Sequence, residues 1–466
     1  MGIKAVKFGG TSLSHAEQMK KAAEIVLSDK ERRIITVSAP GKRFPQDEKI
    51  TDLLYRMDGA QTKEEKEKIF SVIRKRLDTM ISDLGLHLDF SDEYREISEG
   101  NIKGDRLFSM GEYFCAKIFA TLLHCHFTDA ADVIFLHENG TPDLPKIKNA
   151  VQNLMKKQER TVIPGFYGAK PNGEIAVLPR GGSDITGALT AYGADADIYE
   201  NFTDVNGVQL ADPRMVPNTV TVAEISYEEL RRLSSMGACV LHADSVLPLM
   251  ASEIPIFIRN TNDPNGDYTK ISAQKRRIAA DDCSPIQASL ASKQRKRRGR
   301  FRIISHSIKK RRNVALSYSG IVGQKGYLLF SVVLREIGKN ISDFGNLLRF
   351  FESHTKHVYS TPHTVDSVGL LVNKDELNTA QEELVRQLYE DFHAEKVSVT
   401  EHIALLSLIG ENLSAQSARL ILKAMKEVGA EPILLDGGAD SLGMTVGFHE
   451  NFLLPLVKKL HAELVG

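Results

Sequence analysis

The sequence predicts an α/β fold: a doubly wound, mostly parallel sheet, followed by two α+β modules. Across about the first 270 residues, short β-type runs alternate with helix-length segments, which is the pattern of a layered α/β domain. Two of the strands end in a Gly-Gly turn that opens into a helix, as is typical of parallel sheets. In the C-terminal part, strand and helix signals recur in two short units of similar make-up, which form a loose repeat.

The expected elements follow in chain order. An amphipathic helix over residues 16–27 lies between strands at 6–8 and 33–38, and charge-rich helical sequence runs from 52 to 84. Further strands are expected at residues 161–166, 174–178, 197–202 and 254–258, with a helix of small residues at 183–192. In the C-terminal part we expect strands at 365–372, 403–409, 432–435 and 442–446, and helices at 376–392, 414–428 and 453–464.

The composition is that of an ordinary globular protein and argues against several other classes. Of the 466 residues, 42% are hydrophobic and 26% are charged. No run approaches the ~18 consecutive apolar residues of a membrane span, and Lys4 and Lys7 interrupt the apolar start, which argues against a signal peptide. The four cysteines are scattered without a CxxC pair, so we expect neither a disulfide framework nor a metal site. These features predict a soluble, cytoplasmic protein.

The net charge of zero hides one strongly basic segment. Residues 293–312 hold eleven Lys or Arg and no Asp or Glu. The remaining 446 residues carry 49 basic and 60 acidic side chains, a net charge of −11. The chain is therefore mildly acidic, with positive charge concentrated in one stretch.

The first candidate anion site is the motif KFGGTS at residues 7–12, where the first strand turns toward a helix. Gly9 and Gly10 allow the backbone to approach an anion closely, and the N–H groups that follow favour negative charge. Lys7 is suited to place a positive charge on phosphoryl oxygens during transfer. Taken alone, the motif fits an ordinary strand-to-helix turn equally well, because it has the spacing of neither a P-loop nor a dinucleotide-binding turn.

A second Gly-Gly turn, RGGSD at residues 180–184, opens the helix of small residues. Ser183 is suited to cap this helix, and the helix dipole would stabilise Asp184 in the first turn, so stability alone could explain both. Arg180, however, is a planar fork that fits a substrate carboxylate. Two such turns in one α/β domain can hold two anions that face each other, a nucleotide phosphate and an acceptor.

Two further polar motifs are weaker. Residues 202–208 (FTDVNGV) and 211–214 (ADPR) form polar loops in which a nucleotide could lie, although Asn-Gly and Asp-Pro are also plain turn chemistry. The motif SMGE at residues 109–112 places the Glu112 carboxylate near the expected start of a helix, where it could serve the helix dipole alone.

In order and approximate spacing, these motifs resemble those of the aspartate kinases in the amino acid kinase family. The resembling segments are residues 7–12, 38–41 (SAPG), 111–112 (GE), 180–184, 203–207, 212–214 and 240–242 (VLH). The resemblance covers nearly all of residues 3–272 and resumes at residue 344, where the sequence resembles paired ACT modules that bind amino-acid effectors. It implies a catalytic domain at 1–275, a first ACT domain at 300–396 and a second ACT domain made of 285–292 and 397–466, within which the first is nested.

The resemblance implies transfer of the γ-phosphate of ATP, with Mg²⁺ held mainly by the nucleotide phosphates, to the β-carboxylate of L-aspartate. This reaction is the first step toward lysine, threonine and methionine. Lys7 and Asp184 are the implied catalytic residues: Lys7 stabilises the phosphoryl group and Asp184 organises the groups around it. Substrate contacts are implied for Thr11, Ser12, Ser38, Glu112, Arg180 and Ser183, and nucleotide contacts for Lys7, Gly9, Gly10, Thr203, Asp204 and Arg214. No nucleophile from the protein is required, because the substrate carboxylate attacks in line.

For the C-terminal modules the resemblance implies regulation. It implies a homodimer formed through these modules that binds lysine or threonine. The implied effector residues are Phe344, Gly345, Thr364, Val365, Asp366 and Ser367. Asp366 and Ser367 could equally be only turn residues at the start of a strand.

Three features depart from the family pattern. Cys239 stands where a lysine commonly precedes Val-Leu-His, and Gln209 stands where many members have a tyrosine, so both affect the expected nucleotide contacts. Residues 285–292 are the expected first regulatory strand, but the atypical basic segment 293–341 that follows matches no family element. This segment is an inserted, solvated loop, a stretch read in a shifted frame, or, as the least favoured reading, a nucleic-acid or polyanion site.

Two other functions stay open. A kinase of the same fold could act on another carboxylate, such as glutamate or N-acetylglutamate, although the paired C-terminal modules and Glu112 argue against it. The chain could instead be an amino-acid-sensing regulatory protein that has lost catalysis and binds polyanions through its basic segment. The intact Lys7, Arg180 and Asp184 disfavour that function.

Overall fold

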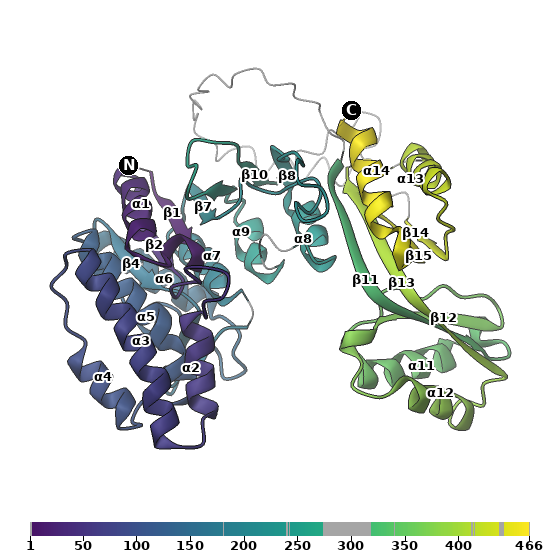
Figure 1. Ribbon diagram of the computed structural model, residues 1–466, viewed down its shortest axis with the longest axis horizontal. Coiled ribbons are helices and arrows are strands. Elements are labelled where there is room, and N and C mark those ends of the chain that lie inside the picture. The colour runs from purple at the N-terminus through teal and green to yellow at the C-terminus, as the bar shows by residue number, and fades with distance from the viewer. Residues whose placement is uncertain are drawn as a thin grey trace.

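The computed structural model describes most of the chain. The described residues are 2–179, 181–238, 241, 243–273, 318–339, 341–411, 413, 415–437 and 442–465. The N-terminal part is a layered α/β body, and the C-terminal part is an antiparallel sheet with helices at both of its ends (Figure 1). None of the helices among these residues has both the length and the apolar character that crossing a membrane requires.

The N-terminal body is built on an eight-stranded sheet with the order β3-β4-β2-β1-β7-β9-β10-β8. Its strands are β1 (Lys4–Phe8), β2 (Arg32–Val37), β3 (His126–Phe127), β4 (Thr161–Pro164), β7 (Ile198–Thr203), β8 (Glu224–Ser226), β9 (Ile256–Asn260) and β10 (Thr269–Ser272). The strands are parallel except that β10 and β8 run opposite to β9. The strand order reverses at β1, because β2 pairs with one of its edges and β7 with the other. In open α/β sheets, ligands bind at such a reversal, outside the carboxyl ends of the strands.

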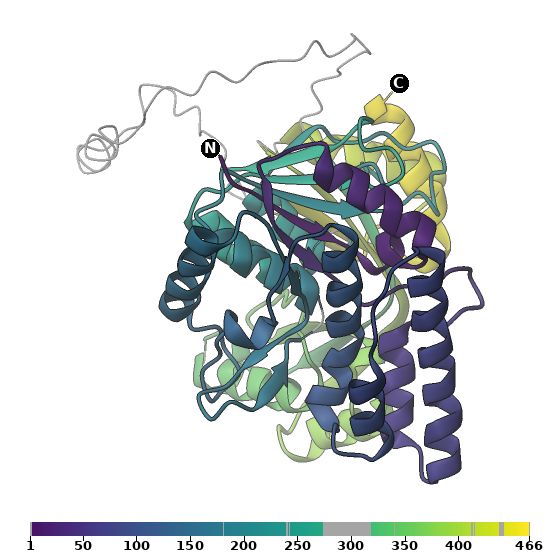
Figure 2. The same ribbon diagram turned by 90° about the vertical axis from the view of Figure 1, so that its left-hand side faces the viewer.

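Helices cover both faces of this sheet (Figure 2). They are α1 (Ala16–Leu27), α2 (Ile50–Gly59), α3 (Lys63–Asp83), α4 (Ser91–Ser98), α5 (Gly104–Leu122), α6 (Leu144–Lys157), α7 (Gly182–Gly193), α8 (Tyr227–Ser235) and α9 (Leu247–Ala251), with short 3-10 turns η1 (Gly10–Leu13), η2 (Ala130–Asp132) and η3 (Ala243–Val246) and a hairpin of β5 (Tyr167–Ala169) and β6 (Ile175–Val177). Alternate residues of β1 enter different cores. Val6 and Phe8 pack with α1 and α5, whereas Ala5 packs with α6 and α7.

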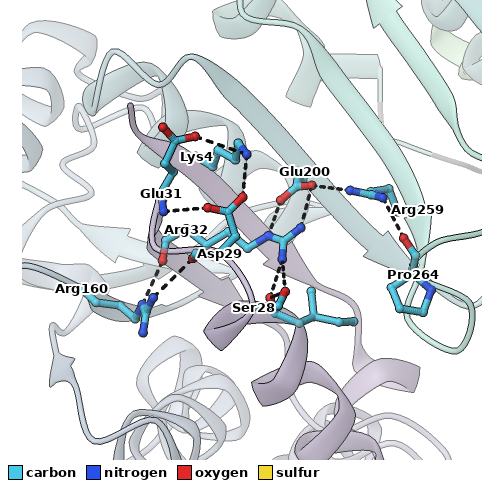
Figure 3. Close-up of polar contacts among 10 residues, drawn as sticks. Lys4, Ser28, Asp29, Glu31, Arg32, Arg160, Glu200, Arg259 and Pro264 are labelled. Carbon is cyan, nitrogen blue, oxygen red and sulfur yellow. Dashed lines mark hydrogen bonds and ion pairs between the residues drawn. The ribbon is translucent and has the colours of Figure 1, made fainter. Parts of the chain in front are cut away.

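A buried ion cluster joins the central strands on the α1 face of the sheet. Glu200 of β7 is 4% exposed and accepts hydrogen bonds from Arg32 Nε of β2, at 2.6 Å, and from Arg259 Nη1 of β9, at 2.8 Å. Figure 3 shows both guanidinium groups directed at this one carboxylate. Although burial acts to raise it, the two arginines hold the pKa of Glu200 below its ordinary value. The cluster spans β1, which lies between β2 and β7 and carries Lys7.

The C-terminal part is a five-stranded antiparallel sheet with the order β12-β11-β13-β15-β14. Its elements are β11 (Tyr318–Val333), η5 (Ile337–Lys339), α11 (Ile341–His354), β12 (Ser367–Asn373), η6 (Lys374–Glu376), α12 (Gln381–Glu390), β13 (Lys396–Gly410), α13 (Ala415–Val428), β14 (Leu434–Asp436), β15 (Gly443–His449), η7 (Glu450–Phe452) and α14 (Leu453–Val465). The long strands β11 and β13 serve two modules, because one half of their ladder lies beside β12 and the other half beside β15. Helices α11 and α12 pack near one end of these strands, and α13 and α14 near the other (Figure 1).

The structure confirms the fold class that the sequence predicts, an α/β sheet followed by α+β modules, and corrects three details. The helical stretch at 52–84 is two helices, and the expected helix at 376–392 is the shorter α12. The sequence assigns no element to 293–341, whereas β11 and η5 lie in its second half. β11 escapes prediction because Gly320, Gly323 and Gly326 are poor strand formers. The expected strand at 285–292 and the basic run at 293–312 lie outside the described residues.

Candidate active site

Lys7 and Asp184 meet at the carboxyl end of β1. Lys7 is the penultimate residue of β1, and Asp184 lies in the first turn of α7, which packs against β1 and β2. Lys7 Nζ is 2.6 Å from Asp184 Oδ1, and Lys7 is only 7% exposed. Gly187, one turn further along α7, permits this close packing, since an added Cβ would lie 3.1 Å from Lys7 Cβ. A largely desolvated ammonium group is therefore held at the edge of the sheet where ligands bind.

Asn201 and Tyr199 of β7 extend this cluster, and the sequence did not single them out. Asn201 lies beside Lys7 in the β1–β7 register, and its Nδ2 donates to Asp184 Oδ1 at 3.0 Å. Tyr199 is 1% exposed, and its hydroxyl has no hydrogen-bond partner among the described residues. Burial, and then the charge of Asp184, raise the pKa of Tyr199 well above its ordinary value. Both residues lie on the strand face toward α7, so they surround Asp184.

The loops that follow β1 and β2 pack backbone against backbone. The Gly41 N–H donates to the Gly10 carbonyl oxygen at 2.7 Å, and a Cβ on Gly41 would lie 2.6 Å from the Gly10 carbonyl carbon. The Ser38 N–H donates to the Phe8 carbonyl oxygen at 3.1 Å, which places Ser38 beside the first Gly-Gly turn. The close approach explains why both loops contain glycine.

The two hydroxyl residues after the first Gly-Gly turn lie in different surroundings. Thr11 is exposed. Ser12 is 2% exposed and its hydroxyl is 2.6 Å from the Thr261 hydroxyl, at the end of β9. Thr11 is thus open to a ligand, while Ser12 ties the turn to the residue that follows β9.

Glu112 lies in the middle of α5, not near the start of a helix as the sequence indicates. It is 4% exposed, and Gly111 lets α5 approach the loop after β2, since a Cβ there would lie 2.9 Å from Ala39 Cβ. Burial raises the pKa of Glu112 to about 8, although a hydrogen bond from the Ala39 N–H favours the ionised form. Its Oε2 has no hydrogen-bond partner among the described residues. This buried carboxyl is therefore suited to receive a cationic group.

The second Gly-Gly turn begins α7 in a way that the sequence did not predict. Gly181 is the N-cap residue, with φ of +79°, a left-handed conformation that suits glycine. Ser183 is the second residue of α7 and not its cap, because Gly181 already holds that position. Ser183 lies against the end of β4, since a Cβ on Gly165 would lie 2.7 Å from Ser183 Cβ. Arg180 lies outside the described residues.

The predicted nucleotide residues after β7 contact other residues of their own segment. Thr203 ends β7, and its hydroxyl donates to Asp204 Oδ1 at 3.1 Å. The Arg214 side chain is 90% exposed and instead pairs with Asp212, at 2.6 Å. Gln209 donates to the Asn206 carbonyl oxygen at 3.2 Å and so fastens its own loop. Cys239, residue 240 and residue 242 lie outside the described residues.

Residues 2–260 include all of these loops and the strands from β1 to β9, and they match the amino acid kinase family. The chain belongs to the amino acid kinase family. Among curated proteins, it is 26% identical to aspartokinase 3 of Bacillus subtilis, over 99% of this chain and 98% of that protein. It is 27% identical to lysine-sensitive aspartokinase 3 of Escherichia coli, over 88% of this chain and 87% of that protein.

Solved structures named as aspartate kinase or aspartokinase share the whole architecture. The aspartate kinase of Clostridium acetobutylicum superposes with a TM-score of 0.82 at 29% identity, over 100% of both chains. Aspartokinase III of Escherichia coli in complex with aspartate and ADP shares the fold, with a TM-score of 0.74 at 22% identity, over 100% of both chains. The C-terminal modules are therefore part of the matched fold as well as the sheet around Lys7.

The predicted effector residues of this family member come from two segments that meet, the start of α11 and the turn before β12. Thr364 and Ser367 are joined through their hydroxyl groups at 2.7 Å, and Asp366 Oδ1 accepts from the Glu336 N–H at 2.9 Å. The ring of Phe344 of α11 is tilted against that of His363, with ring centroids 5.6 Å apart. Val365 is 50% exposed, and a Cβ on Gly345 would meet open space.

Proposed function

We propose that this protein is an ATP-dependent aspartate kinase, which transfers the γ-phosphate of ATP to the β-carboxylate of L-aspartate. The products are ADP and 4-phospho-L-aspartate, and the reaction is the first step toward lysine, threonine and methionine. The observation that carries the proposal is the desolvated Lys7–Asp184 pair at the point where the strand order reverses. Support comes from nearly full-length likeness to proteins named aspartokinase or aspartate kinase.

Lys7 supplies the positive charge that phosphoryl transfer requires. In the transition state, charge spreads over the oxygens of the transferred group while attacking and leaving oxygens lie in line. Because Lys7 is only 7% exposed, its attraction for that charge is stronger than it would be in water. Asp184 holds the ammonium group, and Asn201 in turn holds Asp184, so little reorganisation is needed when charge develops.

The acceptor is the aspartate β-carboxylate, which attacks the γ-phosphorus directly. One oxygen–phosphorus bond forms as the bond to the bridging oxygen of ADP breaks, and no side chain of the protein is covalently modified. Glu112 receives the α-ammonium group of aspartate, and Arg180 receives the α-carboxylate. Thr11, Ser12, Ser38 and Ser183 complete the substrate side.

The nucleotide side is formed by residues from three loops. They are Gly9, Gly10, Thr203, Asp204 and Arg214. Mg²⁺ would bind together with the nucleotide, since this ion commonly binds through substrate phosphates and only one or two carboxylates. When bound, it neutralises part of the charge on the β- and γ-phosphates. Arg214 would leave Asp212 to reach a nucleotide.

The same proposal assigns a function to each part of the chain. Residues 1–275 form the catalytic domain, and residues 300–396 form a first ACT domain nested within a second made of 285–292 and 397–466. β11 contributes to both modules. The modules form a homodimer that binds lysine or threonine through the segments around Phe344 and Asp366, and thereby controls the kinase.

One assay tests the proposal: ADP release or hydroxamate formation with aspartate, compared with glutamate and N-acetylglutamate. We expect aspartate to be the preferred acceptor. A Lys7→Ala control should lose about 10²–10³-fold in kcat, because it removes the charge that stabilises the transition state. Preference for glutamate or N-acetylglutamate would indicate a different carboxylate kinase. Turnover of aspartate no faster than in the Lys7→Ala control would refute the kinase itself.

A further inference from the structure

Arg76 of α3 is a buried arginine that contacts both active-site loops. Its side chain is 3% exposed. Its Nη2 donates to the Gly41 carbonyl oxygen, in the loop after β2, and lies 3.5 Å from the Ser14 carbonyl oxygen, in the loop after β1. Its Nη1 donates to the Glu48 carbonyl oxygen at 2.7 Å. One guanidinium group therefore binds backbone carbonyl oxygens from two loops that follow different strands.

The contact with Gly41 continues into the first Gly-Gly turn. The Gly41 N–H donates to the Gly10 carbonyl oxygen at 2.7 Å, so a single peptide segment links Arg76 to the turn beside Lys7. The same loop carries Ser38, and its Ala39 N–H bonds the buried Glu112 carboxyl. Two buried side chains thus hold the loop after β2. Arg76 binds the carbonyl group of Gly41, and Glu112 binds the N–H group of Ala39.

The charge of Arg76 is not well compensated where it lies. Asp47 is 3.5 Å from Nη1 but is held more closely by Arg43, at 2.8 Å, and Arg76 Nε has no acceptor among the described residues. Burial lowers the pKa of Arg76 despite the attraction of Asp47. A buried ion pair of this kind is weak evidence for a stabilising role. The planar fork of arginine, which reaches several acceptors at fixed angles, accounts for its place against these carbonyl groups.

We propose that Arg76 is a positioning residue for phosphoryl transfer, which fixes the loop of residues 38–41 against the Gly9–Gly10 turn. Through that contact it sets where the turn and Ser38 stand relative to Lys7. The inference rests on the proposed function, because it assigns this geometry to turnover. Misplacement of reacting groups by about 1 Å can reduce a reaction rate about 100-fold. A comparable shift of the loop of residues 38–41 would therefore be enough to lower kcat by such a factor.

The test compares Arg76→Lys with Arg74→Lys in the full-length enzyme. Arg74 lies on the same helix, is partly exposed, and has its nearest carboxylate contact, Glu67, at 3.8 Å. Lysine keeps the charge of Arg76 but lacks the planar fork, so its single nitrogen cannot take the positions of both Nη1 and Nη2. We expect kcat of Arg76→Lys to fall about 10–100-fold, with KM for ATP and for aspartate changed less than about threefold. Arg74→Lys should stay within about twofold of wild type in all three constants.

Hydrogen exchange measured by mass spectrometry gives a second readout that does not depend on activity. In Arg76→Lys, peptides covering residues 9–15 and 38–49 should exchange faster, while peptides from β2 should exchange as in wild type. A role in stability alone would lower the melting temperature and leave kcat of the folded protein unchanged. Both the kinetic and the exchange changes are required, and the presence of only one of them would overturn the proposal.

If Arg76→Lys does not fold, Gly41→Ala carries the test. Its methyl group would lie within 2.8 Å of the Gly10 carbonyl group and of the Thr11 nitrogen, so it separates the two loops without changing the Arg76 side chain itself. Wild-type kcat in folded Gly41→Ala would overturn the proposal, because the loop contact would then be dispensable. If wild type itself shows no turnover with aspartate, the proposed function fails, and the exchange comparison decides alone whether Arg76 holds the loops.

Discussion

Replacing Glu112 by glutamine removes a titratable group from the active site while keeping its shape. Burial raises the pKa of Glu112 to about 8, against the hydrogen bond from the Ala39 N–H. An aspartate α-ammonium group placed at Oε2 stabilises the ionised carboxylate, so the substrate binds best to deprotonated enzyme. In wild type, kcat/KM for aspartate should therefore rise with pH and level off above about pH 8.

The size of this effect follows from the pKa. At about pH 6.5, roughly 3% of a group with a pKa near 8 is ionised, and at about pH 8 half of it is, so kcat/KM should rise ~15-fold across this interval. Glu112→Gln should lack this rise. Above about pH 8 it should be ~10–100-fold below wild type, because a charge-assisted hydrogen bond of about 1.5–3 kcal/mol is lost.

The free energy of unfolding of wild type should fall as pH rises, whereas kcat/KM rises. Because folding raises the pKa of Glu112, the folded state binds more protons than the unfolded state between about pH 4.5 and 8, and wild type becomes less stable as pH rises through that window. The free energy of unfolding of wild type should fall relative to Glu112→Gln by at most about 5 kcal/mol. Urea denaturation at several pH values measures this difference.

Initial rates of ADP release between about pH 6 and 9, fitted for wild type and Glu112→Gln, provide the main assay. Glu99→Gln, which alters an exposed glutamate at the end of α4, is the matched control and should keep the wild-type profile. A flat wild-type profile, or the same pH-dependent rise in Glu112→Gln, would refute the assignment of this buried carboxyl to the substrate ammonium group.

Three further changes test other parts of the structure. Glu200→Ala leaves the buried Arg32 and the partly buried Arg259 without their carboxylate and should lower the free energy of unfolding by about 3–5 kcal/mol in urea denaturation; an unchanged midpoint would contradict the ion cluster. Gly187→Ala places a methyl group 2.4 Å from the Tyr199 hydroxyl and 3.1 Å from Lys7 Cβ, so α7 must shift and kcat should fall about 100-fold, whereas unaltered kcat would show that its close packing is unnecessary. Asp366→Ala should weaken inhibition by lysine or threonine about tenfold in a dose–response assay without changing uninhibited kcat, and equal inhibition would remove Asp366 from the effector site.

Local sequence chemistry was sufficient for the fold class, for individual elements and for the choice of Lys7 and Asp184 as candidates. The amphipathic period over residues 16–27 predicts α1 with its observed bounds, because such a period is a property of one contiguous segment. Lys7 and Asp184 could be chosen together because each adjoins a Gly-Gly turn after a strand. The expectation that parallel strands bring both turns to one edge of the sheet is wrong for the second turn, because β6 pairs with β5 in an antiparallel hairpin outside the eight-stranded sheet. The contact of 2.6 Å arises instead because α7 packs against β1.

The tertiary structure decided which side chains surround that pair. In the sequence, Asn201 and Tyr199 look like ordinary strand residues. Only the pairing of β7 with β1, almost two hundred residues away, places Asn201 opposite Lys7. Arg76 has the pattern of a charged helix surface, yet its guanidinium group is buried against Gly41, thirty-five residues earlier. Glu112 resembled a helix-start acid and is instead a buried carboxyl with a raised pKa. Motifs show which residues can bind an anion, but burial and register depend on the packing of distant segments, so only the folded chain shows what holds those residues in place.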